Sequence, residues 1–413
     1  MSISKTTFEE TSPPFYLQIL VGITGVLDRL GVSLVNIDID NVKAAVEKKT
    51  GLTNWGNPQF YNDWKTHADF VNRNKGLNLT GKIAIRNDYT RHLTNYLLLQ
   101  DAIKRHPDMI TQPITRPIII TGLPRTGTTL LQRMLSQDPA SRGPALWELF
   151  NPVVVDTPPD AATKFQTRSE SFVKMVKNNS VPLWSIHPML SNEADECTFI
   201  LPHHLGDLAI HAGMEYFDWY MKRDATPDYE LHKQYLQSLQ YKKTPQRRWV
   251  LKSPIHLPKL EALLKVYPDA CIVFCHRSMT HVMASWFSYM ATSKKFVAKN
   301  VDPKEVARNW LRIWKESMDI AMDVRAKFKP EQFFDVAYDD LVENPVKIAK
   351  EIYAHFDLPW SLTGERAMQQ WLDNDRKTQK VGHRYTLQQF GMNEQTLMDT
   401  YKTYMEKYNV PVD

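Results

Sequence analysis

Cysteine is scarce in this sequence, with three residues among 413. A sparse and odd set of cysteines argues against the disulfide frameworks that stabilise small secreted domains. Cys271 and Cys275 lie four residues apart in an apolar stretch, so in a strand they would point to the same face. We interpret them as two small buried hydrophobic residues rather than as a metal-binding or redox pair.

Long hydrophobic runs are also missing, and no apolar stretch approaches the ~20 residues that a membrane-spanning helix needs. The apolar segment 15–24 follows two glutamates and has no small-residue cleavage pattern after it, unlike a secretory signal. We interpret this segment as an amphipathic helix. The sequence therefore predicts a cytosolic protein that does not act at a membrane.

A large charge of one sign is absent as well, because the formal net charge is +5 with 23% charged and 43% hydrophobic residues. The net positive charge is too small, and the charged residues are too scattered along the chain, to predict a nucleic-acid partner, although a positive charge suits an anionic ligand. No group of residues has metal-ligand spacing, so we expect no metal. The length allows one large or two ordinary domains with ample core.

The most informative segment that is present spans residues 117–131. A β-branched run leads into a loop bounded by Gly122 and Gly127, and an apolar helical pattern follows the loop. Such a strand–loop–helix turn presents backbone N–H groups and the positive end of a helix dipole to an anion. Arg125 adds a fixed positive charge. Hydroxyl donors come from Thr126, Thr128 and Thr129. The loop is therefore predicted to hold a phosphate-like group.

The same loop differs in one respect from the Walker A motif of proteins that bind nucleoside triphosphates. The spacing Gly122-x4-Gly127 matches a Walker A loop, which continues with Lys and then Ser or Thr. Here Thr128 and Thr129 follow the second glycine, and the charge lies earlier, at Arg125. The pattern favours phosphate binding over hydrolysis of a nucleoside triphosphate.

A second candidate anion site lies further along the chain. Residues 272–277 are typical of a buried strand that ends in a cation, Arg277. Ser285 follows eight residues later, in a helix predicted to start near Thr280. An Arg at a strand end and a Ser on the next helix can bind one phosphate from two sides. Two anion sites on one chain indicate a ligand with phosphates at both ends.

Together these motifs resemble those of the sulfotransferases that use 3′-phosphoadenosine-5′-phosphosulfate (PAPS). The segment Gly122–Leu131 is similar to their 5′-phosphosulfate loop, and Arg277 and Ser285 are similar to their 3′-phosphate pair, with the same separation. The resemblance extends from about Gln112 to Tyr401. It implies PAPS as the sulfuryl donor and adenosine 3′,5′-bisphosphate as the product.

The resemblance also implies contacts to the adenine and to the 3′-phosphate. Tyr338 lies in a segment similar to the family's Tyr-Glu-Asp-Leu, whose Tyr contacts the base. Many relatives place a Trp after the paired threonines, where this chain has Leu130, so that stacking face is missing. The basic run that contains His383 and Arg384 is expected to serve as the family's C-terminal phosphate-binding segment, although its pattern differs.

For catalysis, Arg125 is the natural partner of the bridging oxygen, where many relatives carry Lys. Arg stays charged but cannot donate its proton, so its help to the leaving group would be electrostatic. Lys252 ends another predicted strand, at the place of the Lys in the Lys-Thr-His motif of cytosolic relatives. This chain has Lys252-Ser253-Pro254, so the base of that motif is replaced.

The general base must therefore come from another residue. Glu148 lies at nearly the distance from the loop helix of the Glu that acts as base in the tyrosine-sulfating branch. His256 follows Lys252 by four residues and has a suitable pKa near neutrality. Glu193 and Glu196 are further carboxylates. We expect Glu148 first, His256 second, and the other carboxylates after them.

Fold class follows from the alternation of strands and helices. Predicted strands at 117–121, 248–251, 271–276 and 333–337 are followed by helices at 128–137, 258–266, 280–291 and 345–356. This alternation predicts an α/β fold with a parallel sheet flanked by helices, as in P-loop-like sulfotransferases. We expect a helical N-terminal region at 1–112, an α/β domain at 113–413, and a helical lid at 150–246 that covers the acceptor.

The function predicted is transfer of a sulfuryl group from PAPS to a hydroxyl or amino group of a small-molecule acceptor. A kinase that uses ATP and magnesium is the first alternative, and a non-catalytic nucleotide-binding protein is the second. A kinase would bind ATP without a preference for a 3′-phosphate, so that preference distinguishes a sulfotransferase from the first alternative. A binding protein would hold PAPS without turnover, so turnover distinguishes a sulfotransferase from the second.

Overall fold

The computed structural model describes residues 35, 37–74, 76–179, 188–206, 211–243, 246–377 and 385–413. The apolar segment 15–24 and the basic residues His383 and Arg384 lie outside the described residues, so their predicted roles stay predictions. Within the described part of the chain, no helix has the length and apolar character needed to cross a membrane.

A five-stranded parallel sheet forms the centre of the molecule, in the order β2-β3-β1-β4-β5. The strands are β1 (Ile118–Gly122), β2 (Ser141–Arg142), β3 (Arg248–Lys252), β4 (Cys271–His276) and β5 (Phe333–Ala337). The predicted parallel α/β fold is confirmed, and four strands lie within one residue of their predicted positions. The edge strand β2 was not predicted, because two residues carry no recognisable alternation.

Helices precede the sheet, connect its strands and follow it. The N-terminal helices are α2 (Ile39–Thr50), α3 (Pro58–Arg73), α4 (Leu79–Arg105) and the 3-10 helix η1 (Pro107–Thr111). Between β1 and β3 lie α5 (Thr128–Leu135), α6 (Leu146–Phe150), α7 (Ala161–Asn179), η2 (Cys197–Phe199), α10 (Met214–Lys222) and α11 (Thr226–Gln240). Between β3 and β5 lie η3 (Pro254–Lys259), α12 (Leu260–Val266), α13 (Met279–Val297), α14 (Pro303–Arg325) and η4 (Pro330–Gln332). The C-terminal elements are α15 (Tyr338–Glu343), α16 (Pro345–His355), α17 (Leu362–Lys377), η5 (Gln388–Phe390) and α18 (Glu394–Tyr408).

Alternate residues of the strands point into two separate hydrophobic cores, one on each face of the sheet. Ile118 and Ile120 of β1 join a core formed with α5, α16 and α17, whereas Ile119 faces a larger core on the other side. Cys271 and Cys275 lie together in the smaller core as free, buried thiols. Both faces are covered by helices, which explains why the strands read as continuous apolar runs.

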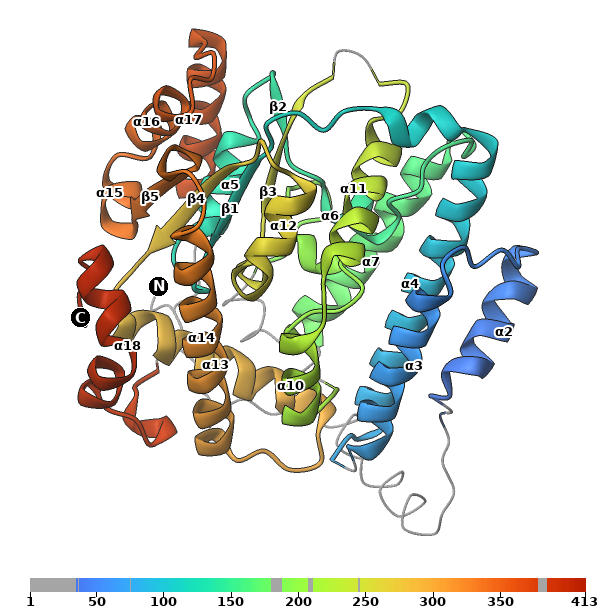
Figure 1. The fold of residues 1–413 in the computed structure, drawn as a ribbon, viewed down its shortest axis with the longest axis horizontal. Helices are drawn as coiled ribbons and strands as arrows, with labels where there is room; N and C mark the ends of the chain where they lie inside the picture. The colour runs from blue at the N-terminus through green and yellow to red at the C-terminus, as the bar shows by residue number, and fades with distance from the viewer. Residues whose placement is uncertain are drawn as a thin grey trace.

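The larger core continues from the sheet into the N-terminal helices, which lie on the far side of the molecule from α15–α17 (Figure 1). The side chain of Asn95 on α4 donates to the carbonyl of Phe150 at 3.1 Å. Arg223 binds Asp63 of α3 at 2.6 Å. The helical arm therefore packs directly against the helical insertion that separates β2 from β3.

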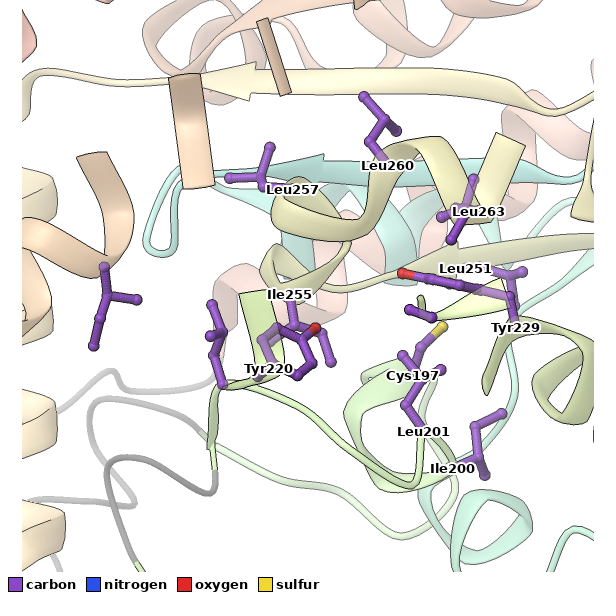
Figure 2. Packing of buried hydrophobic residues seen from close by; sticks show 14 of the residues in the cluster. Cys197, Ile200, Leu201, Tyr220, Tyr229, Leu251, Ile255, Leu257, Leu260 and Leu263 are labelled. Atoms are coloured by element: carbon purple, nitrogen blue, oxygen red, sulfur yellow. The ribbon is translucent and has the colours of Figure 1, made fainter. Parts of the chain in front are cut away.

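The insertion itself is anchored on β3. Its buried residues Cys197 and Tyr229 pack with Leu251 of β3 and with neighbouring leucines of η3 and α12 (Figure 2). Because Leu251 precedes Lys252, this packing fixes the insertion beside the carboxyl end of the strand. The insertion is thereby placed next to the edge of the sheet where ligands of parallel α/β folds bind.

Candidate active site

The loop after β1 folds back tightly over the end of β4. Gly122 has φ +135°, and a Cβ atom there would lie 2.4 Å from the carbonyl oxygen of Cys275, so only glycine fits. Arg125 and Gly127 also have positive φ, at 70° and 86°. The hydroxyl of Thr126 donates to the carbonyl of Leu123 at 2.8 Å and closes the turn. The loop is thus a compact bend whose shape the two glycines permit.

Helix α5 starts directly from this bend. Its N-cap is Gly127, which offers no side chain to the first N–H groups of the helix. Those groups and the hydroxyls of Thr128 and Thr129 therefore lie at the start of the helix, where an anion is favoured by the helix dipole. Leu130, the next residue, packs against the smaller core rather than offering an aromatic face.

Arg125 and the second predicted anion site come together in space. The Nε of Arg125 donates to the Ser285 hydroxyl at 3.1 Å, and Arg277 donates to the carbonyl of Arg125 at 3.1 Å. Burial lowers the pKa of Arg125, and the nearby charge of Arg277 acts in the same direction. Two cations and a hydroxyl therefore converge on one region, which an anion would stabilise.

An aromatic ring forms one wall of this region. The guanidinium of Arg277 lies 3.8 Å from the ring centroid of Tyr338, at the start of α15. A Cβ atom on Gly127 would come within 3.0 Å of the Tyr338 ring, so the glycine lets the loop pass close to the aromatic face. The predicted adenine contact, the loop and the second cation are thus neighbours.

The N-terminus of α13, between Arg277 and Ser285, is already occupied. The N–H groups of Met279 and Thr280 donate to the carbonyls of Pro411 and Val412, at 3.2 and 2.8 Å. An anion at this site would therefore be held by side chains and not by the first amides of that helix.

Lys252 reaches the loop from β3. Its ammonium group lies 3.2 Å from the Thr129 hydroxyl and 2.7 Å from Oε1 of Glu196. The lysine side chain is fully buried, whereas the Glu196 side chain is 21% exposed. The other oxygen of Glu196 accepts from Thr198 at 3.3 Å and from Ser253 at 3.4 Å. Lys252 therefore contacts both the Glu196 carboxylate and the first turn of the helix that follows the loop.

Glu148 has a different environment from the one expected of a base. Its carboxylate is buried, accepts from the Ala145 N–H at 3.0 Å, and forms an ion pair with Arg142. Lys243 lies 3.8 Å from its other oxygen. Arg142 belongs to β2 and stacks on Trp249 near the amino end of β3. Three groups therefore hold this carboxylate, none of them from the loop region, and its catalytic role stays a prediction.

His256 lies in the core of η3. Its Nδ1 forms a hydrogen bond with the Tyr229 hydroxyl at 2.8 Å, and the ring is 1% exposed. Burial, with smaller contributions from His232 and Lys252, lowers its pKa well below 6.5, so the ring is neutral. The structure places it among buried aromatic residues, and its role as a base also stays a prediction.

A partly buried network next to Arg277 was not predicted from the sequence. His276, the preceding residue, binds the Tyr404 hydroxyl at 2.8 Å and the Asp335 carboxylate at 2.8 Å. Both guanidinium NH groups of Arg325 bind the two oxygens of Asp335 at 2.6 Å. Although burial opposes the effect, the bonds from Arg325 and His276 lower the pKa of Asp335 to about 2. Tyr404 lies 128 residues from His276, and no local pattern signals the pairing.

Comparisons with known proteins agree with this geometry. A family model described as "Sulfotransferase family" matches residues 117–361. The solved structure of sulfotransferase STF1 from Mycobacterium tuberculosis H37Rv is 28% identical, covers 90% of this chain and 99% of that chain, and has a TM-score of 0.77. Sulfotransferase STF9 from Mycobacterium avium, at 24% identity, shares the fold over 90% of this chain and 97% of that chain with a TM-score of 0.80. No curated protein sequence matches significantly.

Proposed function

Because this chain belongs to the sulfotransferase family, we propose that it transfers a sulfuryl group from PAPS to a hydroxyl or amino group of a small-molecule acceptor. The observation that supports the donor most directly is the convergence of Arg125, Arg277 and Ser285 through hydrogen bonds of 3.1 Å. A donor with anionic groups at its 5′ and 3′ positions matches two cations held this close together.

The loop would bind the 5′ end of this donor. The N–H groups at the start of α5 and the hydroxyls of Thr128 and Thr129 would contact the phosphosulfate. Arg277 and Ser285 would bind the 3′-phosphate, and Tyr338 would lie along the adenine. A Cβ atom at residue 127 would lie only 3.0 Å from the Tyr338 ring and from Leu341, so glycine is what lets the loop approach the tyrosine this closely.

Sulfuryl transfer needs charge stabilisation more than covalent chemistry. The acceptor atom forms a bond to sulfur while the bond from sulfur to the bridging phosphate oxygen breaks, and the bisphosphate leaves with the electron pair. Arg125 and Lys252 would stabilise the negative charge on the bridging and sulfonate oxygens. Arg125 keeps its proton throughout, so its contribution is electrostatic.

The acceptor would enter from the helical insertion at 150–246. Glu196 of this insertion accepts from Lys252 at 2.7 Å, and the hydroxyl of Thr198 lies 2.9 Å from that of Ser253, so both residues would lie on the acceptor side of the loop. The insertion is rich in aromatic side chains, which favours a small hydrophobic, heteroaromatic or cationic acceptor. Acidic side chains there are also compatible with an amine, and hence with nitrogen as well as oxygen sulfation.

A thermal-shift comparison of nucleotides tests the donor assignment. Adenosine 3′,5′-bisphosphate should stabilise the protein far more than AMP or ATP at equal concentration, by about 2.7 kcal/mol at a hundred times its dissociation constant. Ser285→Ala should reduce this preference. Equal stabilisation by AMP and the bisphosphate would contradict the 3′-phosphate site, and stronger stabilisation by ATP with magnesium would favour a kinase. Transfer of labelled sulfur from PAPS across an acceptor panel then tests turnover.

A further inference from the structure

Glu196 lies beside Lys252, close to the start of α5, and we propose that it removes the acceptor proton during transfer. The inference rests on the proposed function and names the catalytic carboxylate of that same site. Its Oε1 lies 2.7 Å from Lys252, whose ammonium group is in turn 3.2 Å from the hydroxyl of Thr129 on the phosphate-loop helix. One lysine thus joins the carboxylate to the place where the sulfonate would be held.

The backbone before Glu196 is anchored to the same helix. The side-chain amide of Gln132 on α5 donates to the carbonyls of Asp195 and Val250, at 3.1 and 3.3 Å. Arg133, the next residue on α5, donates to the carbonyl of Ala194 at 3.3 Å. Because Gln132 and Arg133 are both buried, the carboxylate keeps a fixed position relative to the loop that starts this helix.

The surroundings of Glu196 leave it accessible to a substrate. Its side chain is 21% exposed although its lysine partner is fully buried. Both carboxylates have partners, with Lys252, Thr198 and Ser253 on Glu196 and with Arg142, Lys243 and a backbone N–H on Glu148, but the Glu148 side chain is only 6% exposed. A general base must come within about 2.6–3.2 Å of the proton that it takes. By exposed fraction, the carboxylate of Glu196 is therefore more accessible to an acceptor than that of Glu148.

Because Lys252 pairs with Glu196, binding of the donor would also change how strongly the lysine holds this carboxylate. Before the donor binds, Lys252 neutralises the carboxylate. A sulfonate beside Thr129 would share the lysine and weaken its hold on Glu196. The acceptor proton then passes to the Glu196 carboxylate as the acceptor–sulfur bond forms and the bond to the bridging oxygen breaks. The protonated carboxyl group afterwards loses its proton to water, which restores the starting state.

Glu196→Gln tests this role because it preserves shape and removes basicity. The variant should lose on the order of 10²–10⁴-fold in kcat, while its affinity for adenosine 3′,5′-bisphosphate stays the same or increases. The acid limb of the wild-type pH–rate profile should disappear. Glu47→Gln is the matched control, since Glu47 forms a 2.6 Å ion pair with Lys43 on α2, in the N-terminal helical arm. It should keep the wild-type rate.

Several results would overturn the assignment. A Glu196→Gln variant with kcat within threefold of wild type, or with an unchanged acid limb, would exclude Glu196 as the base. The same conclusion follows if Glu148→Gln alone produces the large loss. Should the glutamine variant fail to fold, Glu196→Asp should fold with a reduced kcat and normal bisphosphate affinity, and a full rate would refute the role. A wild-type protein that transfers no sulfur from PAPS would refute the proposed function itself.

Discussion

Replacing Glu148 by Gln should reduce stability far more than catalysis. The carboxylate is buried with Arg142, their side chains being 6% and 12% exposed, and Lys243 adds a weaker contact at 3.8 Å. Gln keeps the size of the side chain and an acceptor for the Ala145 N–H, which is 3.0 Å away. The change therefore removes one charge and leaves the guanidinium of Arg142 with a neutral partner.

The size of the effect follows from these contacts. A hydrogen bond to a charged group contributes about 1.5–3 kcal/mol, and complete loss of a buried partner costs about 3–5 kcal/mol. Since Gln still accepts one bond from Arg142, we expect a loss of about 2–3 kcal/mol in the free energy of unfolding. In a double variant, Arg142→Met with Glu148→Gln, part of this loss should be recovered because the buried cation left without a carboxylate is removed, while Lys243 is half-exposed.

The assay compares urea unfolding followed by tryptophan fluorescence with the kcat of the folded protein at low temperature. The expected result is a lower unfolding midpoint with kcat close to wild type. An unchanged midpoint together with a loss of more than a hundredfold in kcat would refute this reasoning and restore Glu148 as the base.

Three further predictions concern Arg277, Arg125 and the buried His232. Arg277→Ala should weaken binding of adenosine 3′,5′-bisphosphate by about 10- to 150-fold in calorimetry, and unchanged affinity would move the 3′-phosphate site elsewhere. Arg125→Ala should lower kcat by about 10²–10³-fold with a smaller change in KM. A normal kcat with a raised KM would instead show that Arg125 only binds the donor. Burial lowers the pKa of His232 to about 3 from an ordinary 6.5, so the unfolded chain binds more protons between these values. The free energy of unfolding should therefore fall as pH drops below about 6.5, and urea titrations of His232→Asn should show a shallower fall.

The strongest sequence predictions came from patterns that are local in the chain. The loop from Gly122 to Gly127 and the strand that ends before Arg277 could be located because glycine, charge and apolar alternation occur within a few residues. The spatial meeting of Arg125 with Ser285 follows from parallel strands whose carboxyl ends share one edge of the sheet. These features are confirmed in the fold, while the roles of the residues stay predictions.

The choice among the candidate bases could not be made from local sequence, because tertiary packing sets the surroundings of each side chain. Glu148 was placed first by its spacing from the loop, yet the chain turns so that its carboxylate faces Arg142. His256 is close to Lys252 in sequence, but the 3-10 helix directs its ring into the core against Tyr229. Glu196 approaches Lys252 only through packing of an insertion whose position no local pattern specifies. Spacing alone therefore could not rank the three.

The carbonyls of Pro411 and Val412 that cap α13 have a consequence for how donor preference can change during evolution. A phosphate held by helix amides is difficult to lose by mutation, because every residue type supplies an N–H group except proline. With those amides of Met279 and Thr280 already used, recognition of a 3′-phosphate would depend on two replaceable side chains, Arg277 and Ser285. One or two codon changes would then be enough to shift a descendant of this protein toward nucleotides without that phosphate, while the 5′ loop stayed intact.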